Sequence, residues 1–109
     1  MDRAFALEYT KQFWDDISEA IRYIVYELRN PPAAQKLKDD TEREIRSRSF
    51  SPLSYEPYFT DEETGDVYYY IRVGNFMVFY VVEGEVMEVR RFVYGRRNLG
   101  KVLSDRTDG

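Results

Sequence analysis

The pattern of hydrophobic and polar positions divides the chain into one short strand, two helices and three further strands. Apolar side chains alternate over Ala4–Tyr9, which is typical of a strand with one buried face. Over Lys11–Arg29 they recur at spacings of three and four, which predicts an amphipathic helix with Thr10 as its N-cap. A second, thinner apolar stripe runs from Pro32 to Ser47 and predicts another helix.

The connection between the two predicted helices is Asn30-Pro31-Pro32. Proline has no backbone N–H to donate and disfavours the helical conformation of the residue before it, so the first helix should end near Arg29. Pro32 is tolerated in the first turn of the next helix, where its missing N–H would be unpaired anyway. The short connection predicts an antiparallel pair of helices, whose remaining apolar surface requires a sheet.

Three strands are predicted in the second half of the chain, over Val67–Val73, Phe76–Val82 and Glu85–Tyr94. The dipeptides Gly74-Asn75 and Glu83-Gly84 between them are typical of two-residue hairpin turns, so the strands should form an antiparallel meander. Residues 50–66 contain Pro52 and Pro57 and read as a loop. The predicted fold is α+β in the order β-α-α-β-β-β: an antiparallel sheet, joined by the N-terminal strand, with the helical hairpin on one face.

The length of 109 residues allows one domain, which we assign to residues 1–104. The last five residues, 105–109, are expected to form a frayed tail, and a short helix is expected to pass through 101–103.

The absence of Cys and His excludes several kinds of chemistry. There can be no thiol nucleophile or thiolate metal site, and the commonest general base and metal ligand are missing. Neighbouring carboxylates at 15–16, 39–40 and 61–63 fit solvated surfaces better than a metal or acid–base pair. No apolar run is long enough to span a bilayer, and the N-terminus lacks a signal-peptide core. We therefore expect a cytoplasmic protein with no cofactor, metal, small-molecule ligand or membrane contact.

The net charge of −4 disfavours nonspecific nucleic-acid binding, but the charges are segregated along the chain. Between Val86 and Lys101 the only acidic residue is Glu88. The basic residues there are Arg90, Arg91, Arg96, Arg97 and Lys101. Together with Arg72 they could form a patch for an anion or an acidic partner, since guanidinium groups bind phosphate and carboxylate alike. In the alternative interpretation, Arg90 or Arg91 pairs with Glu88, Glu83 or a helix carboxylate and has only a structural role.

The triplet Tyr68-Tyr69-Tyr70 lies in a predicted strand, so Tyr69 should point to one face of the sheet and its two neighbours to the other. If helices cover only one face, at least one of these rings lies on the open face. Exposed tyrosines are common at protein interfaces and can also stack on RNA bases. The alternative is that they complete a small core.

Four segments, taken in order, resemble the RelE/ParE superfamily of toxins from type II toxin–antitoxin modules, often described as plasmid stabilisation proteins. They are FALEYT running into FWDDI (5–17), NPPAA (30–34), YIRVGNFMVFY (70–80) and VRRFVYGRRN (89–98). The resemblance covers nearly the whole chain, and the family's fold agrees with the order of elements predicted above.

The resemblance implies one of two activities. RelE-like members are ribosome-dependent mRNA endoribonucleases, and in that case Arg97 matches the catalytic arginine after the last strand and Arg72 falls near a basic position of the second strand. ParE-like members inhibit DNA gyrase. Both kinds are neutralised by a cognate antitoxin. For contact with the target or antitoxin, the candidate residues are Arg90, Arg91, Tyr94, Arg96, Arg97, Tyr68 and Tyr70.

Two departures from the nuclease pattern favour the ParE-like branch. Met77 stands where RelE-like nucleases place an arginine, and Leu103 stands in place of a C-terminal tyrosine. Methionine cannot hold a phosphate and leucine cannot transfer a proton. The sequence therefore predicts a toxin that acts by binding a target such as gyrase. The alternatives are a ribosome-dependent nuclease and a non-toxic member that only binds an antitoxin.

Overall fold

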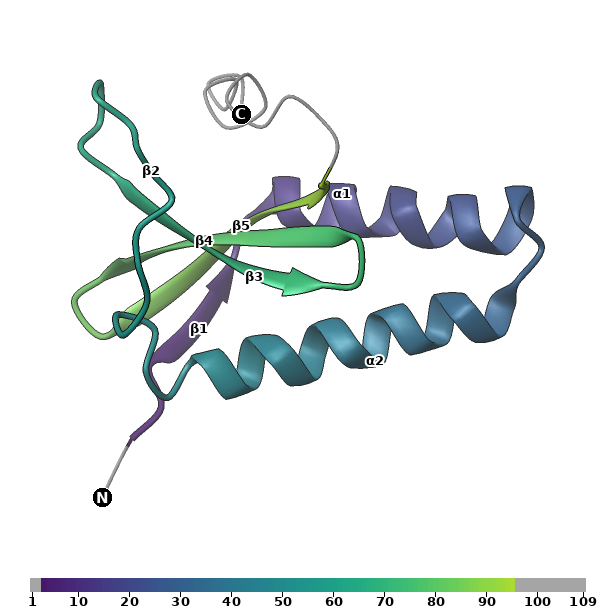
Figure 1. Ribbon diagram of the computed structural model, residues 1–109, viewed down its shortest axis with the longest axis horizontal. Helices are drawn as coiled ribbons and strands as arrows, with labels where there is room; N and C mark the ends of the chain where they lie inside the picture. Colours follow the sequence, from purple (N-terminus) through teal and green to yellow (C-terminus); the bar gives the residue numbers. More distant parts are fainter. Residues whose placement is uncertain (1–2, 96–109) are drawn as a thin grey trace.

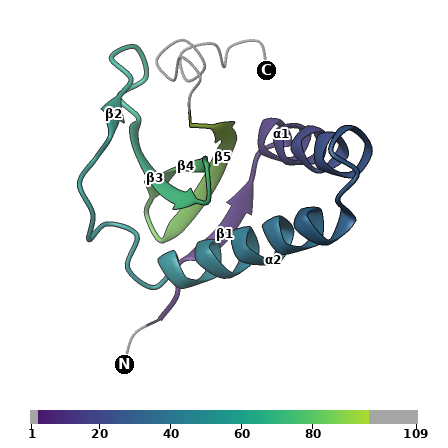
Figure 2. The same cartoon turned by 45° about the vertical axis from the view of Figure 1, so that its right-hand side comes forward.

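Two helices lie on one face of a five-stranded sheet in the computed structural model, which describes residues 3–95 (Figures 1 and 2). The elements are β1 (Ala6–Tyr9), α1 (Lys11–Arg22), the π-helical turn η1 (Tyr23–Glu27), α2 (Pro31–Arg48), β2 (Phe59–Thr60), β3 (Val67–Val73), β4 (Phe76–Glu83) and β5 (Val86–Tyr94). The predicted α+β class and the helical hairpin on one face are confirmed. The expected helix at 101–103 and the tail lie outside the described residues.

Local chemistry sets the ends of both helices. The hydroxyl oxygen of Thr10 accepts a hydrogen bond from the Phe13 amide at 3.1 Å, as expected of an N-cap. The first helix changes from α to π geometry at Tyr23. The π-helical turn ends at Glu27, before the predicted helix end at Arg29. Asn30 caps α2 by accepting from the Ala33 amide, so this helix begins one residue earlier than predicted, at Pro31.

The strand order is β1-β5-β4-β3-β2. Strands β3, β4 and β5 form the predicted antiparallel meander, but β1 lies parallel to β5, so the sheet is mixed rather than wholly antiparallel. The two helices between β1 and the meander bring the chain back so that β1 and β5 run in the same direction. The two-residue strand β2, within the predicted loop, pairs with β3.

The two hairpin turns require backbone that favours glycine. Gly74 and Gly84 have φ of +60° and +62°, a left-handed conformation that costs other residues energy. The first turn is Gly74-Asn75 as predicted, whereas the second is Gly84-Glu85, one residue later than predicted, because β4 extends to Glu83.

A bulge in β5 decides which side chains reach the main core. Phe79 pairs with Arg91 while Tyr80 pairs with Val89, which leaves Arg90 as the extra residue. Because of this insertion, Val89 and Phe92 both point toward the helices although they are three residues apart.

Apolar side chains are buried on both faces of the sheet. The larger cluster joins the helices to the sheet and includes Phe13, Ile17, Ile45, Val78, Tyr80 and Val89. The second cluster, on the opposite face, contains Tyr68, Met77, Phe79, Val81 and Val93, with Phe59 packed against it. Tyr69 packs against the larger cluster, which confirms the predicted alternation of the tyrosine triplet.

Candidate partner-binding surfaces

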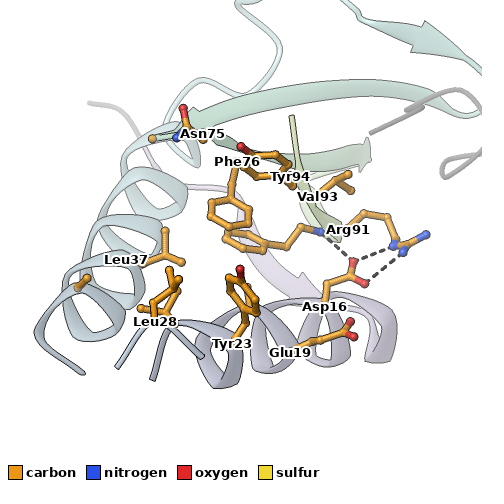
Figure 3. Close-up of a pocket in the computed structure, with 15 residues that line it drawn as sticks. Asp16, Glu19, Tyr23, Leu28, Leu37, Asn75, Phe76, Arg91, Val93 and Tyr94 are labelled. Atoms are coloured by element: carbon orange, nitrogen blue, oxygen red, sulfur yellow. Dashed lines mark hydrogen bonds and ion pairs between the residues drawn. The ribbon is translucent and has the colours of Figure 1, made fainter. Parts of the chain in front are cut away.

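A pocket of about 810 Å³ lies between the helical hairpin and the ends of β4 and β5 (Figure 3). Its floor is the stacked ring pair of Phe76 and Phe92, whose centroids are 4.6 Å apart. Its lining on the helical side includes Asp16, Glu19, Tyr23, Ile24, Leu28 and Leu37, and on the sheet side Asn75, Arg91, Val93 and Tyr94. The pocket is mainly apolar, with charged groups along one wall.

Asp16 fixes the charged wall by joining α1 to β5. Its carboxylate accepts from Nε and Nη2 of Arg91 at 2.8 and 3.1 Å and from the Phe92 amide at 3.0 Å (Figure 3). Strand β1 pairs with β5 only as far as Val89 and does not reach the Phe92 amide. The Asp16 carboxylate accepts the hydrogen bond from this amide in place of a strand carbonyl. Arg91 therefore lies at the pocket and is held by a helix carboxylate. This agrees with the alternative interpretation, in which Arg91 pairs with a carboxylate of the same chain.

The outer rim of the pocket is formed by the π-helical turn. Tyr23 and Leu28 are both 56% exposed, and Tyr26 beside them is 70% exposed. Arg29 then adopts a φ of +53°, a strained conformation for a residue with a side chain, before α2 starts. Short π-helical segments are often found at functional sites. These apolar side chains have no covering element among the residues that the structure describes.

Arg90 lies on the face opposite the helices and is neutralised there. Its guanidinium donates to Glu88 at 2.7 Å, to Asp66 at 2.9 Å and to the hydroxyl of Tyr68 at 3.0 Å. Burial opposes the charged form, but these three hydrogen bonds together outweigh it and raise the pKa of Arg90. The side chain is 22% exposed. This arrangement agrees with the alternative interpretation, in which Arg90 pairs with carboxylates of the same chain and has a structural role.

The structure also places the remaining candidates that fall within the described residues. Tyr68 is buried, with 1% of its surface exposed, whereas Tyr70 is 36% exposed. Tyr94 is 39% exposed and lines the pocket. Arg72 is exposed at the end of β3. The Nη1 atom of Arg72 lies 3.8 Å from the position that a Cβ atom would occupy on Gly95. Arg96 and Arg97 lie outside the described residues.

Met77 is buried in the second apolar cluster, with 4% of its surface exposed. It pairs with Arg72 on one side and Val93 on the other. The position where RelE-like nucleases carry an arginine is thus part of a core.

The pocket rim was not predicted from the sequence. Tyr23 at the rim, and Tyr26 beside it in the π-helical turn, fall off the apolar stripe of the first helix, and large apolar side chains off a stripe are the signal that could have pointed to them. Within residues 3–95 there is no cluster of carboxylates arranged for a metal ion. No helix in that part of the chain is long and apolar enough to cross a membrane.

Comparison with known proteins identifies the family to which the chain belongs. A family model described as the ParE toxin of the type II toxin–antitoxin system parDE matches residues 7–99. A search of curated proteins finds no match. Among solved structures, one titled "Chromosomal ParDE TA system from P. aeruginosa" superposes with a TM-score of 0.66 at 16% identity, covering 84% of this chain and 96% of the other. This likeness supports the fold, and the family model covers most of the chain. The chain belongs to the ParE toxin family of type II toxin–antitoxin systems.

Proposed function

We propose that this toxin acts by binding a macromolecular target, with DNA gyrase as the first candidate, and that a cognate antitoxin neutralises it. The observation that carries the binding mode is the burial of Met77 in an apolar cluster where a nuclease needs a cation at the phosphate. Arg90 and Arg91 are each held by carboxylates of the same chain. These arrangements favour inhibition by contact over phosphate chemistry.

The pocket between the helical hairpin and β5 is the proposed seat of the antitoxin. It combines an aromatic floor with exposed rim residues, so an inserted apolar side chain would remove surface from water on both sides. Tyr94 and Arg91, two of the residues predicted from the sequence, line this pocket and become antitoxin contacts in this proposal.

The test of the mode of action is expression of the full chain without an antitoxin, followed by an assay of DNA supercoiling with purified gyrase. We expect arrested growth and reduced supercoiling. Normal growth together with unaffected gyrase would contradict the gyrase proposal and favour a member that only binds an antitoxin.

The nuclease alternative has one observation in its favour. Arg72 is exposed and lies beside Gly95. Gly95 directly precedes Arg96 and Arg97 in the sequence. If the protein were a nuclease, ribosome-bound mRNA would be cleaved, and Arg97→Ala would abolish cleavage while the fold survived. We expect no cleavage by the wild-type protein.

A further inference from the structure

A second surface, at the other end of α2 from the pocket, is built around Arg48. Its guanidinium carbon lies 3.5 Å from the ring centroid of Tyr55. Its Nη1 atom donates to the carbonyl oxygen of Tyr70 at 3.0 Å and to the hydroxyl of Tyr80 at 2.9 Å. The Tyr80 hydroxyl in turn donates to the buried Pro52 carbonyl at 2.8 Å. The orientation of the guanidinium is therefore fixed before any partner arrives.

The opposite edge of the same guanidinium, formed by Nε and Nη2, makes no hydrogen bond to another described residue. Both hydrogen bonds of Arg48 use Nη1, so Nε and Nη2 have no partner among the described residues. No ion pair joins Arg48 to a carboxylate within that part of the chain. The Nε–Nη2 edge carries two parallel N–H groups, a geometry that matches the two oxygens of a carboxylate.

The exposed ring of Tyr55 covers the guanidinium. The rings of Tyr58 and Tyr70 lie against each other, with centroids 5.5 Å apart, and pack on Phe79 on the face of the sheet opposite the helices. Between 36% and 55% of the residue surface is exposed at each of Leu53, Tyr55, Tyr58 and Tyr70. We define the Arg48 surface as Arg48 together with Leu53, Tyr55, Tyr58 and Tyr70. Tyrosine and arginine side chains that are held in place are the types that contribute most at protein interfaces.

We propose that the Arg48 surface binds a protein segment carrying an aspartate or glutamate flanked by apolar side chains, and that this segment belongs to the target of the toxin. The carboxylate would accept from Nε and Nη2 of Arg48, and its neighbours would pack on the tyrosines. The proposal rests on the proposed function in taking the partner to be a target protein.

A nucleic acid fits the Arg48 surface less well than an acidic peptide. Tight binding to a phosphate backbone uses about six to ten cationic contacts, whereas this surface offers one fixed guanidinium. The nearby loop 50–66 contains five acidic residues and no basic one, and the whole chain has a net charge of −4. A phosphate backbone, with many repeated negative charges, would be repelled more strongly than an apolar segment with one carboxylate.

The Arg48 surface is separate from the pocket. Leu37, which lines the pocket, and Arg48 are eleven residues apart on α2, which corresponds to about 16 Å along the helix. One partner can therefore occupy the pocket while the target contacts the Arg48 surface, and for this reason we assign the segment to the target.

The chemical class of the ligand is tested by titration of the ¹⁵N-labelled full chain with blocked peptides. The probes are Pro-Phe-Asp-Phe-Pro, the same peptide with Asn in place of Asp, and a single-stranded oligonucleotide. We expect the Asp peptide to shift the Nε–H signal of Arg48 and to bind about tenfold more tightly than the Asn peptide. Equal binding of both peptides, or tighter binding of the oligonucleotide, would overturn the proposal.

Arg48→Lys keeps the charge but removes the two-hydrogen edge, so it should lower the affinity for the Asp peptide to that of the Asn peptide. The matched control is Arg43→Lys on the same helix, where Arg43 is exposed and paired with Asp40. This control should leave peptide binding unchanged. The wild-type titration needs no variant, so the proposal remains testable if Arg48→Lys fails to fold.

The assignment to the target is tested in cells. A toxin with Arg48→Lys should lose growth arrest and still copurify with the antitoxin encoded beside it. Full growth arrest by this variant, or loss of copurification, would overturn the assignment. If the wild-type protein neither arrests growth nor inhibits gyrase, the proposed function fails, while the peptide titration still decides the chemistry of the Arg48 surface.

Discussion

Asp16 holds the first half of α1 against the part of β5 that β1 does not reach. Three hydrogen bonds end on its carboxylate, and one of them satisfies the backbone amide of Phe92. The side chains of Asp16 and Arg91 are 17% and 20% exposed, so this pair is less screened by solvent than a surface ion pair. Asp16 therefore contributes both to stability and to the shape of the pocket wall.

Asp16→Asn should lower the free energy of unfolding by about 1–2 kcal/mol, because the charged hydrogen bonds to Arg91 are weakened while the amide oxygen can still accept from Phe92. Urea denaturation of the two proteins measures this difference. The matched control is Asp15→Asn, since Asp15 is 63% exposed and, within residues 3–95, pairs with Lys11 alone. The control should change stability by less than about 0.5 kcal/mol. Equal effects of the two substitutions would contradict the role given to Asp16.

The stability of the fold should fall in alkaline solution because one buried tyrosine, Tyr80, and one half-buried tyrosine, Tyr9, resist ionisation. Burial raises the pKa of Tyr80, partly offset by Arg48, and burial followed by the charge of Glu42 raises the pKa of Tyr9. Between the unfolded value of about 10 and the higher folded values, the unfolded chain loses protons that the folded chain keeps. The stability from these groups is therefore full below pH 10 and decreases above it.

The check is the free energy of unfolding by urea from pH 8 to pH 11. We expect a plateau followed by a decline, with a shallower decline in Tyr80→Phe because one of the two groups is gone. A decline that is just as steep in this variant would show that Tyr80 is not responsible.

At the scale of elements, Thr10 joins β1, α1 and β5 through one hydroxyl group. The hydroxyl accepts from the Phe13 amide and donates to the Arg90 carbonyl at 2.8 Å. Thr10→Val, which keeps the shape and removes both hydrogen bonds, should cost about 1–2 kcal/mol of unfolding free energy. Thr10→Ser keeps the hydroxyl and should lose less than half of that amount. Thermal or urea unfolding compares the two variants, and similar losses would contradict the capping role.

The sequence predicted the elements that depend on local periodicity and missed the features set by distant contacts. The helical stripe and the Thr10 cap are local, and both were found. The direction of β1 was not, because alternation is the same in a parallel and an antiparallel strand. The β5 bulge at Arg90 and the π-helical turn each depend on packing against other elements. The spacing of apolar residues along the sequence contains no information about that packing.

The same limit applies to the candidate site. Arg90 and Arg91 were identified as cations, but their partners Asp66 and Asp16 are 24 and 75 residues away in the sequence. Only the folded chain brings them together, so the sequence left both the functional and the structural interpretation open. Tyr94 and Arg91 at the pocket were among the predicted residues, whereas the pocket itself depends on the packing of helices against β5.

At the scale of the whole molecule, α2 separates two surfaces with different chemistry. The pocket near the N-terminal end of α2 is a concave apolar site. The Arg48 surface at the other end of α2 differs from it and combines one oriented guanidinium with exposed tyrosines. Under the proposed function the toxin is neutralised by one protein and acts on another, and two separate surfaces would let each contact change independently.

A pair of matched substitutions tests this separation. Leu28 at the pocket rim and Leu53 on the Arg48 surface are 56% and 55% exposed, so Leu→Asp at either should change unfolding free energy little. Leu28→Asp should weaken antitoxin binding by about 2 kcal/mol, roughly 30-fold, because a buried apolar contact is replaced by a charge. Leu53→Asp should leave antitoxin binding unchanged and reduce growth arrest. Calorimetric titration with the antitoxin and growth assays measure both effects, and the reverse result would mean that the two partners have been assigned to the wrong surfaces.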